Sequence, residues 1–181
     1  MARTSGVFTK QQEDWQDFPS VAAGTLITAT TTNPTYGTVV TNRAQYRIKD
    51  GLLDVMWHFR QTSGGSAGSG TTLFNLPPII PLIDTAKITA STDLSNVTTW
   101  TSGTVGTIYY ASDASSFQGT GTVGLYSANQ FKLMIHGSNG GVSTGTLAST
   151  VTSSFYAFSS SNIAFSVIIT GIPLVGRSAK D

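Results

Sequence analysis

The side chains best suited to metal binding or nucleophilic chemistry are few and scattered along this chain. It has two histidines, His58 and His136, and no cysteine. Each histidine lies among apolar and polar residues that alternate, without further metal ligands at workable spacing, whereas a protein zinc site needs three or four ligands. The sequence therefore predicts ordinary surface or subunit-contact histidines, and neither a metal nor another cofactor.

Two nearby carboxylates, Asp50 and Asp54, have the residue types of a glycosidase acid/base pair. Such a pair must face a cleft at a defined separation. Asp50 is followed by Gly51 between two alternating runs, so a turn already accounts for it. Serines are plentiful, but none lies in a nucleophile-elbow sequence. We expect no enzymatic activity from these residues.

The glycine-serine stretch at residues 64–70, GGSAGSG, resembles a phosphate-binding loop in composition alone. It lacks the lysine that reaches the phosphates, and it lies between predicted strands instead of opening a helix. The sequence predicts a flexible loop that connects two strands.

The clearest structural signal is the alternation of residues 42–60 on either side of the Asp50-Gly51 turn. Tyr46 and Ile48 share one face of the first run, and Val55, Trp57 and Phe59 share one face of the second. A period of two over eight residues indicates a strand with one buried face. Asp-Gly between two such runs predicts an antiparallel hairpin with these side chains in the core.

Further apolar runs at turn-punctuated spacing predict strands over residues 24–32, 85–90, 104–111, 120–127, 130–136 and 162–170. Phe131, Leu133 and Phe165 are expected to join the core. The pattern predicts an all-β fold, an antiparallel β-sandwich or jelly roll of about ten short strands. We expect residues 15–181 to form this single domain and residues 1–14 to form a short arm.

The charge distribution excludes some partners. Charged residues make up 10% of the chain, net charge is +1, and no lysine or arginine cluster occurs. A nucleic-acid surface needs a basic footprint, so nucleic acid is not an expected partner. The apolar run at residues 163–175 is interrupted by Ser166, Thr170, Gly171 and Pro173, so membrane insertion is not expected either.

The amino-terminal segment differs from the rest of the chain in its charges. Val7 and Phe8 form a small apolar plug, surrounded by charges of both signs at Arg3, Lys10, Glu13 and Asp14. By contrast, residues 133–176 contain no Asp, Glu, Lys or Arg. We interpret the first segment as an attachment arm and the second as neutral strand surface that suits self-contact.

Several motifs resemble a module of tailed-bacteriophage virion proteins, the trimeric tumour-necrosis-factor-like jelly roll. The matching elements are Trp15, Thr31-Thr32-Asn33-Pro34, Tyr46-Arg47-Ile48, Val55-Met56-Trp57-His58-Phe59, the loop at residues 64–70, Leu73-Phe74-Asn75-Leu76-Pro77 and the closing NIAFSVIIT at residues 162–170. Such modules form the tips of tail fibres and capsid decoration proteins. The resemblance implies a homotrimer with a structural role in a virion.

Two functions follow from that resemblance, and a third comes from another class. The first is a capsid decoration (cement) protein on the outer surface of a phage head, bound to the major capsid protein lattice. The second is a receptor-binding tip of a tail fibre or baseplate, for which Trp100 is the candidate contact to a host-surface glycan. A tip needs a stalk, and about fourteen residues precede the first anchor, Trp15, which favours decoration. The third and least favoured is a glycan-cleaving enzyme on a β scaffold.

Overall fold

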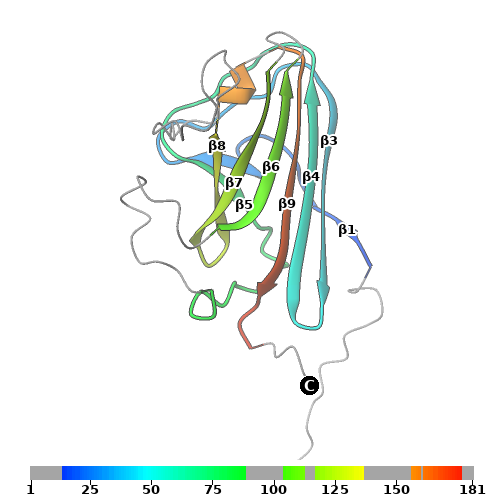
Figure 1. Cartoon of the computed structure of the whole chain (residues 1–181), viewed down its shortest axis with the longest axis vertical. Helices are drawn as coiled ribbons and strands as arrows, with labels where there is room; N and C mark the ends of the chain where they lie inside the picture. The colour runs from blue at the N-terminus through cyan, green and yellow to red at the C-terminus, as the bar shows by residue number, and fades with distance from the viewer. Residues whose placement is uncertain (1–13, 89–103, 113–116, 137–155, 160, 177–181) are drawn as a thin grey trace, which may run out of the picture.

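The computed structural model describes residues 14–88, 104–112, 117–136, 156–159 and 161–176 (Figure 1). Its strands are β1 (Gln16–Asp17), β2 (Ile27–Ala29), β3 (Val39–Lys49), β4 (Leu52–Gln61), β5 (Thr72–Asn75), β6 (Thr104–Ser112), β7 (Phe117–Ser127), β8 (Gln130–His136) and β9 (Ile163–Pro173), with a short 3₁₀ turn, η2 (Tyr156–Ser159). They form one antiparallel sheet in the order β1-β3-β4-β9-β6-β7-β8-β5-β2. The predicted all-β fold of the sandwich or jelly-roll type is confirmed.

The hairpin of β3 and β4 forms where the alternation and the Asp-Gly pair predict it. Lys49 pairs with Leu52, so Asp50 and Gly51 alone make the turn. Their φ angles are 50° and 75°, the positive values that a tight hairpin turn of the right twist requires. The turn thereby fixes the register, and with it the face of each strand that meets the core.

The last strand of the chain lies in the middle of the sheet. β9 pairs with β4 on one side and with β6 on the other, so it joins two hairpins that are distant in sequence. Its inward residues Phe165 and Val167 are buried, and the Phe165 ring stacks on Phe59 of β4 with centroids 4.9 Å apart.

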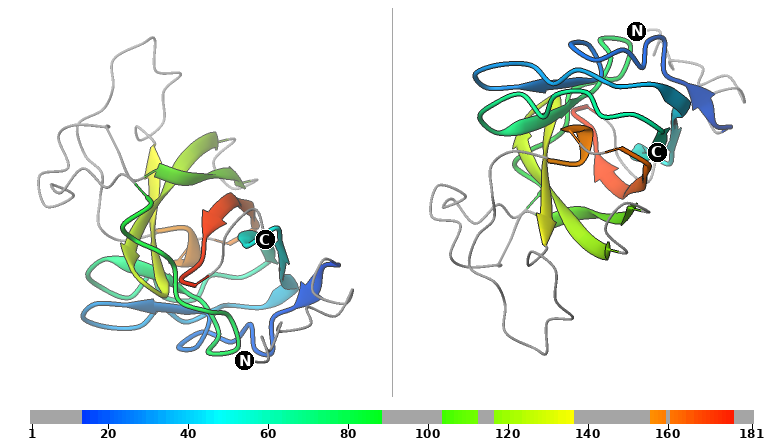
Figure 2. Two further views of the ribbon diagram at one scale, coloured as in Figure 1. Left: turned by 90° about the horizontal axis from the view of Figure 1, so that it is seen from below. Right: turned by 90° about the horizontal axis from the view of Figure 1, so that it is seen from above.

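The sheet curls on itself, as the end-on views in Figure 2 show. In the sheet order, β9, β6, β7 and β8 lie between β4 and β5. The curl nevertheless brings β5 round to face β4 across the core. The ring of Phe74 on β5 lies 5.6 Å from Trp57 and 5.7 Å from Phe18, centroid to centroid. This curling gives the sheet an inside, and it replaces the separate second layer of an open sandwich.

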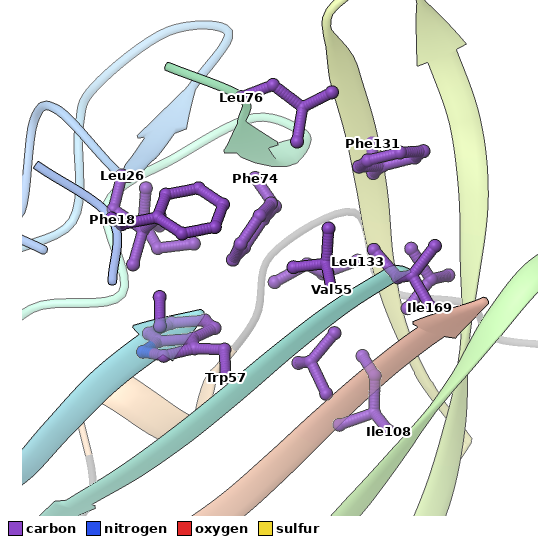
Figure 3. Packing of buried hydrophobic residues seen from close by; sticks show 14 of the residues in the cluster. Phe18, Leu26, Val55, Trp57, Phe74, Leu76, Ile108, Phe131, Leu133 and Ile169 are labelled. Carbon is purple, nitrogen blue, oxygen red and sulfur yellow. The ribbon is translucent and has the colours of Figure 1, made fainter. Parts of the chain in front are cut away.

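The core is the apolar cluster inside this curl (Figure 3). The side chains expected there lie in it: Ile48, Val55, Trp57, Phe59, Phe131, Leu133 and Phe165 are all buried. Tyr46 is half-buried and packs edge-on against Phe18 at the rim. Fully burying one such large side chain contributes about 1.5–3 kcal/mol.

The loop at residues 64–70 corrects the expectation of a flexible linker. Backbone hydrogen bonds join Ser66 with Thr35 and Ser69 with Thr32, so the loop is hydrogen-bonded to the segment before β3. A Cβ on Gly65 would collide with the backbone of Thr35 and Tyr36, and one on Gly68 with that of Thr32. Glycine is needed at these positions because two backbones approach closely there, and not because the loop must be flexible.

Two expected strands differ from the structure. Of residues 24–32, three form a strand, because Gly24 and Thr25 hydrogen-bond within a turn and Asn33 caps Ala29 from beyond it. Residues 84–88 form a turn, in which Lys87 N–H donates to the Asp84 carbonyl, and residues 89–90 lie outside the described part. The main strands are also longer than expected: β3, β7 and β9 each have 11 residues.

Candidate functional site

One side of the curled sheet faces outward over its central strands, and the described residues that point outward there are all uncharged. It is formed by the outward residues of three neighbouring strands, here called the neutral face: Ala164, Ser166, Ile168 and Thr170 on β9, Thr107 and Tyr109 on β6, and Thr120 and Thr122 on β7. The inward residues of the same strands, such as Val167 and Ile108, are fully buried. Alternation along each strand therefore produces the face directly.

The register aligns these side chains in rows across the sheet. Ser166 lies opposite Tyr109, which lies opposite Thr120. In the next row Ile168 lies opposite Thr107, which lies opposite Thr122. Threonine tolerates both water and close packing on a pleated surface, so rows of this composition suit contact with another uncharged surface.

Two large side chains stand out on the neutral face. Ile168 is 44% exposed and Tyr109 is 56% exposed. Amphipathic tyrosine is favoured at protein interfaces, because its ring buries apolar area while its hydroxyl keeps a polar partner. The pair gives the face an apolar centre among hydroxyls.

Charged side chains begin at the flanks of the neutral face. On β4, outward Asp54 is bound by Arg47 of β3, with Arg47 Nε 2.9 Å from Asp54 Oδ2. On β8, Lys132 lies opposite Gly124 of β7. The neutral face is thus a strip three strands wide between two charged margins.

His58 lies at the border of the neutral face, where its Nδ1 atom is 2.8 Å from Ser166 Oγ. In a catalytic Ser-His pair a carboxylate orients the imidazole. The residues that flank His58 in register are Arg43 on β3 and Ser166 itself on β9, so neither strand supplies this carboxylate. The pair is a surface hydrogen bond at the edge of the face.

Asp50 and Asp54 both have structural roles. Asp50 occupies the β3–β4 turn with positive φ. Asp54 accepts hydrogen bonds from Arg47 Nε and, at 2.8 Å, from the backbone N–H of Gly171 at the far end of β9. Both oxygens of Asp54 are therefore engaged in joining β3, β4 and β9.

Tyr36 is a buried polar group away from the neutral face. Its ring packs on Phe59 and Phe158, and its hydroxyl is buried without a hydrogen-bond partner among the described residues. Burial raises the pKa of the Tyr36 phenol above its ordinary value, and nearby Asn42 offsets part of that rise. The ring of Tyr36 thus packs against the core, whereas its buried hydroxyl adds no hydrogen bond to it.

The residues predicted for partner contacts lie mostly beyond the described residues. Of the arm, Asp14 is described, and it is exposed at a bend just before β1. Arg3, Val7, Phe8, Lys10 and Glu13 lie outside the described residues, as does Trp100. Trp15, the expected first anchor, lies against the guanidinium of Arg47, whose carbon is 4.9 Å from the ring centroid.

Ile168 and Tyr109 were not predicted from the sequence as contact residues. The sequence NIAFSVIIT at residues 162–170 contained the signal for Ile168. If Phe165 and Val167 point inward, strict alternation places Ile168 on the outward face. The core does not account for an apolar residue on the outward phase of a strand, so Ile168 together with Tyr109 makes this face a candidate contact surface.

Comparison with models of known protein families, with curated proteins and with solved structures found no match. Within the described ranges, no group of three or more His, Asp or Glu side chains is placed to hold a metal ion. Nor does this part of the chain contain a helix that is long and apolar enough to cross a membrane.

Proposed function

We propose that this chain is a structural virion protein that associates as a homotrimer through the neutral face and decorates the outer surface of a phage capsid. The observation that carries the proposal is the neutral face, with exposed Ile168 and Tyr109 at its centre. The motifs that resemble trimeric phage jelly rolls support two further parts of the proposal, the trimeric state and the role in a virion.

The uncharged composition of the neutral face favours self-association on electrostatic grounds. Around the threefold axis of a homotrimer the same residues of three copies approach one another, so charged side chains close to that axis would repel their own copies. A strip of hydroxyls and apolar groups has no such penalty, and burying Ile168 and Tyr109 removes apolar area from water. Contacts of this kind depend little on salt, because few ion pairs contribute to them.

The first experiment measures the mass of the purified chain by sedimentation at micromolar concentration, from low to high salt. We expect a trimer at every salt concentration. Ile168→Lys should dissociate it, because each contact would then bury an unpaired ammonium group. Val40→Lys is the matched control, since Val40 is a β-branched strand residue that is 55% exposed on β3, outside the neutral face.

A monomeric wild type contradicts the homotrimer. A trimer that survives Ile168→Lys, or that Val40→Lys dissociates equally well, contradicts the neutral face as its interface. The second experiment locates the chain on intact virions with labelled antibody. Label over the capsid supports decoration, whereas label confined to the tail tip favours the receptor-binding alternative.

A further inference from the structure

A second exposed surface, which is apolar, lies at one end of the curled sheet, whereas the neutral face lies on the outer side of its central strands. The segment at residues 76–83, which follows β5, crosses the end where the β3–β4 turn and the end of β9 also lie (Figure 1). Backbone hydrogen bonds fix it to the β7–β8 turn, where Leu76 and Ile83 N–H donate to the carbonyls of Asn129 and Ala128. Another bond, from Val175 N–H to the Leu82 carbonyl at 2.8 Å, fixes it to the chain beyond β9.

This segment is apolar on both its sides. Its inward residues Ile80 and Ile83 are buried and close the end of the core. Its outward residues Ile79 and Leu82 are 71% and 55% exposed, and neighbouring Val175 is 54% exposed. These three exposed residues, Ile79, Leu82 and Val175, are here called the basal patch.

The basal patch is held in a fixed shape before any partner arrives. Pro77, Pro78 and Pro81 lie within the segment and restrict its φ angles. Ile80 N–H closes a turn onto the Pro77 carbonyl at 2.9 Å. Little conformational freedom remains to be lost on binding, and this favours binding by a preorganised surface.

The root of the amino-terminal segment is tied to the same end of the molecule. Trp15 lies against Arg47, Arg47 binds Asp54, and Asp54 accepts a hydrogen bond from Gly171 where β9 ends. Beyond Gly171, Leu174 N–H donates to Gly51 in the β3–β4 turn. The chain that continues before Asp14 therefore starts from the neighbourhood of the basal patch.

We propose that the basal patch is the surface by which the β-sheet body rests on the capsid protein that residues 2–14 grip, and that it contacts an uncharged apolar area of that protein. This inference rests on the proposed function. The residues before Asp14 start near the basal patch, so a partner that they grip close to this starting point meets this end of the body first; their full reach is about 45 Å at most. Just after the segment, Asp84 and Lys87 form an ion pair at 3.1 Å that neutralises itself, which favours an apolar partner surface over a charged one.

The test uses the full chain and virions from which it has been stripped. The double variant Ile79→Ser/Leu82→Ser should bind these virions at least about tenfold more weakly than the wild type. Its trimer mass and melting temperature should match those of the wild type, because neither side chain belongs to the core or to the neutral face. Val40→Ser, which also removes an exposed aliphatic side chain, should bind like the wild type.

Each other outcome overturns the inference in a recognisable way. If the wild type does not bind stripped virions, the proposed function fails and the inference fails with it. If the wild type and the double variant bind equally well, decoration stands and the basal patch has no part in it. If the double variant loses its trimer mass, the patch is a contact between copies of the chain. If phosphatidylcholine vesicles bind the wild type and not the double variant, the patch takes lipid instead of protein.

Discussion

Trp57 Nε1 donates a hydrogen bond to Asn42 Oδ1 across the β3–β4 hairpin, at 2.8 Å. Trp57 is fully buried among aromatic rings, so its indole N–H has no access to water. The Asn42 side chain in turn donates to the Val21 carbonyl at 2.7 Å. One amide thus satisfies the largest core side chain and ties the chain before β2 to the sheet.

Replacing Asn42 by alanine should therefore destabilise the fold by about 1–3 kcal/mol, the cost of leaving a buried donor unpaired. Urea unfolding followed by circular dichroism measures this change. Asn33→Ala is the control, since Asn33 is exposed and accepts a single bond from Ala29 N–H. Equal losses in the two variants would contradict a special role for the Asn42–Trp57 bond.

Truncating Trp57 itself should cost more. Trp57→Ala removes a side chain that contacts Phe59, Phe74 and Phe165, and large cavities of this kind cost about 3–5 kcal/mol. The loss is a large part of the net stability of a domain, so much of the variant should be unfolded or insoluble. A soluble variant with unchanged melting temperature would contradict the packing described here.

Tyr36 makes the stability of the fold sensitive to alkaline pH. Burial raises the pKa of its phenol, so above the ordinary value of about 10 the unfolded chain loses this proton while the folded chain keeps it. The unfolded state then binds fewer protons than the folded state, and stability falls as pH rises from about 10 upward.

Tyr36→Phe should remove this contribution. At neutral pH its stability should equal that of the wild type or exceed it by about 1 kcal/mol, because the buried hydroxyl has no partner to lose. The difference in free energy of unfolding between the variant and the wild type should increase as the pH rises from about 9 to about 11. Urea unfolding at several pH values measures this difference. Tyr126→Phe, at an exposed phenol, is the control. An advantage independent of pH would contradict the raised pKa.

Gly65→Ala tests the packing of the loop at residues 64–70. Gly65 does not have a positive φ, yet its Cβ would meet the backbone of Thr35 and Tyr36, which cannot give way as a side chain can. We expect a loss of about 3 kcal/mol or more. Gly171→Ala is the comparison, because Gly171 has φ of 70° with open space around it, and it should cost about 1 kcal/mol. Similar small losses in both variants would favour a loosely packed loop.

Deleting residues 2–14 tests the attachment arm. Ordering a short arm costs about 1–2 kcal/mol per residue, which three arms on one trimer offset better than one arm could. The truncated chain should therefore keep its fold and its trimer mass while losing binding to stripped capsids in a co-sedimentation assay. Undiminished binding would make the arm a passive terminus, and it would assign attachment to the body.

Local signals in the sequence were sufficient for most of the long strands and for the inward residues of the central hairpin. Alternation around Trp57 and Phe59, with Asp50-Gly51 between the runs, depends on residues a few positions apart, because a strand's two faces and a two-residue turn are local properties. The same alternation, applied to residues 162–170, would have placed Ile168 outward.

The tertiary structure decided which strands pair and what lies between them. Alternation shows which face of a strand is buried, but backbone hydrogen bonds pair any strand with any other, so nothing local places β9 between β4 and β6. For the same reason composition cannot distinguish a flexible glycine from Gly65, whose need for close approach comes from Thr35, or show that Asp54 binds Gly171. The neutral face and the basal patch exist because these long-range pairings bring distant uncharged residues onto one surface.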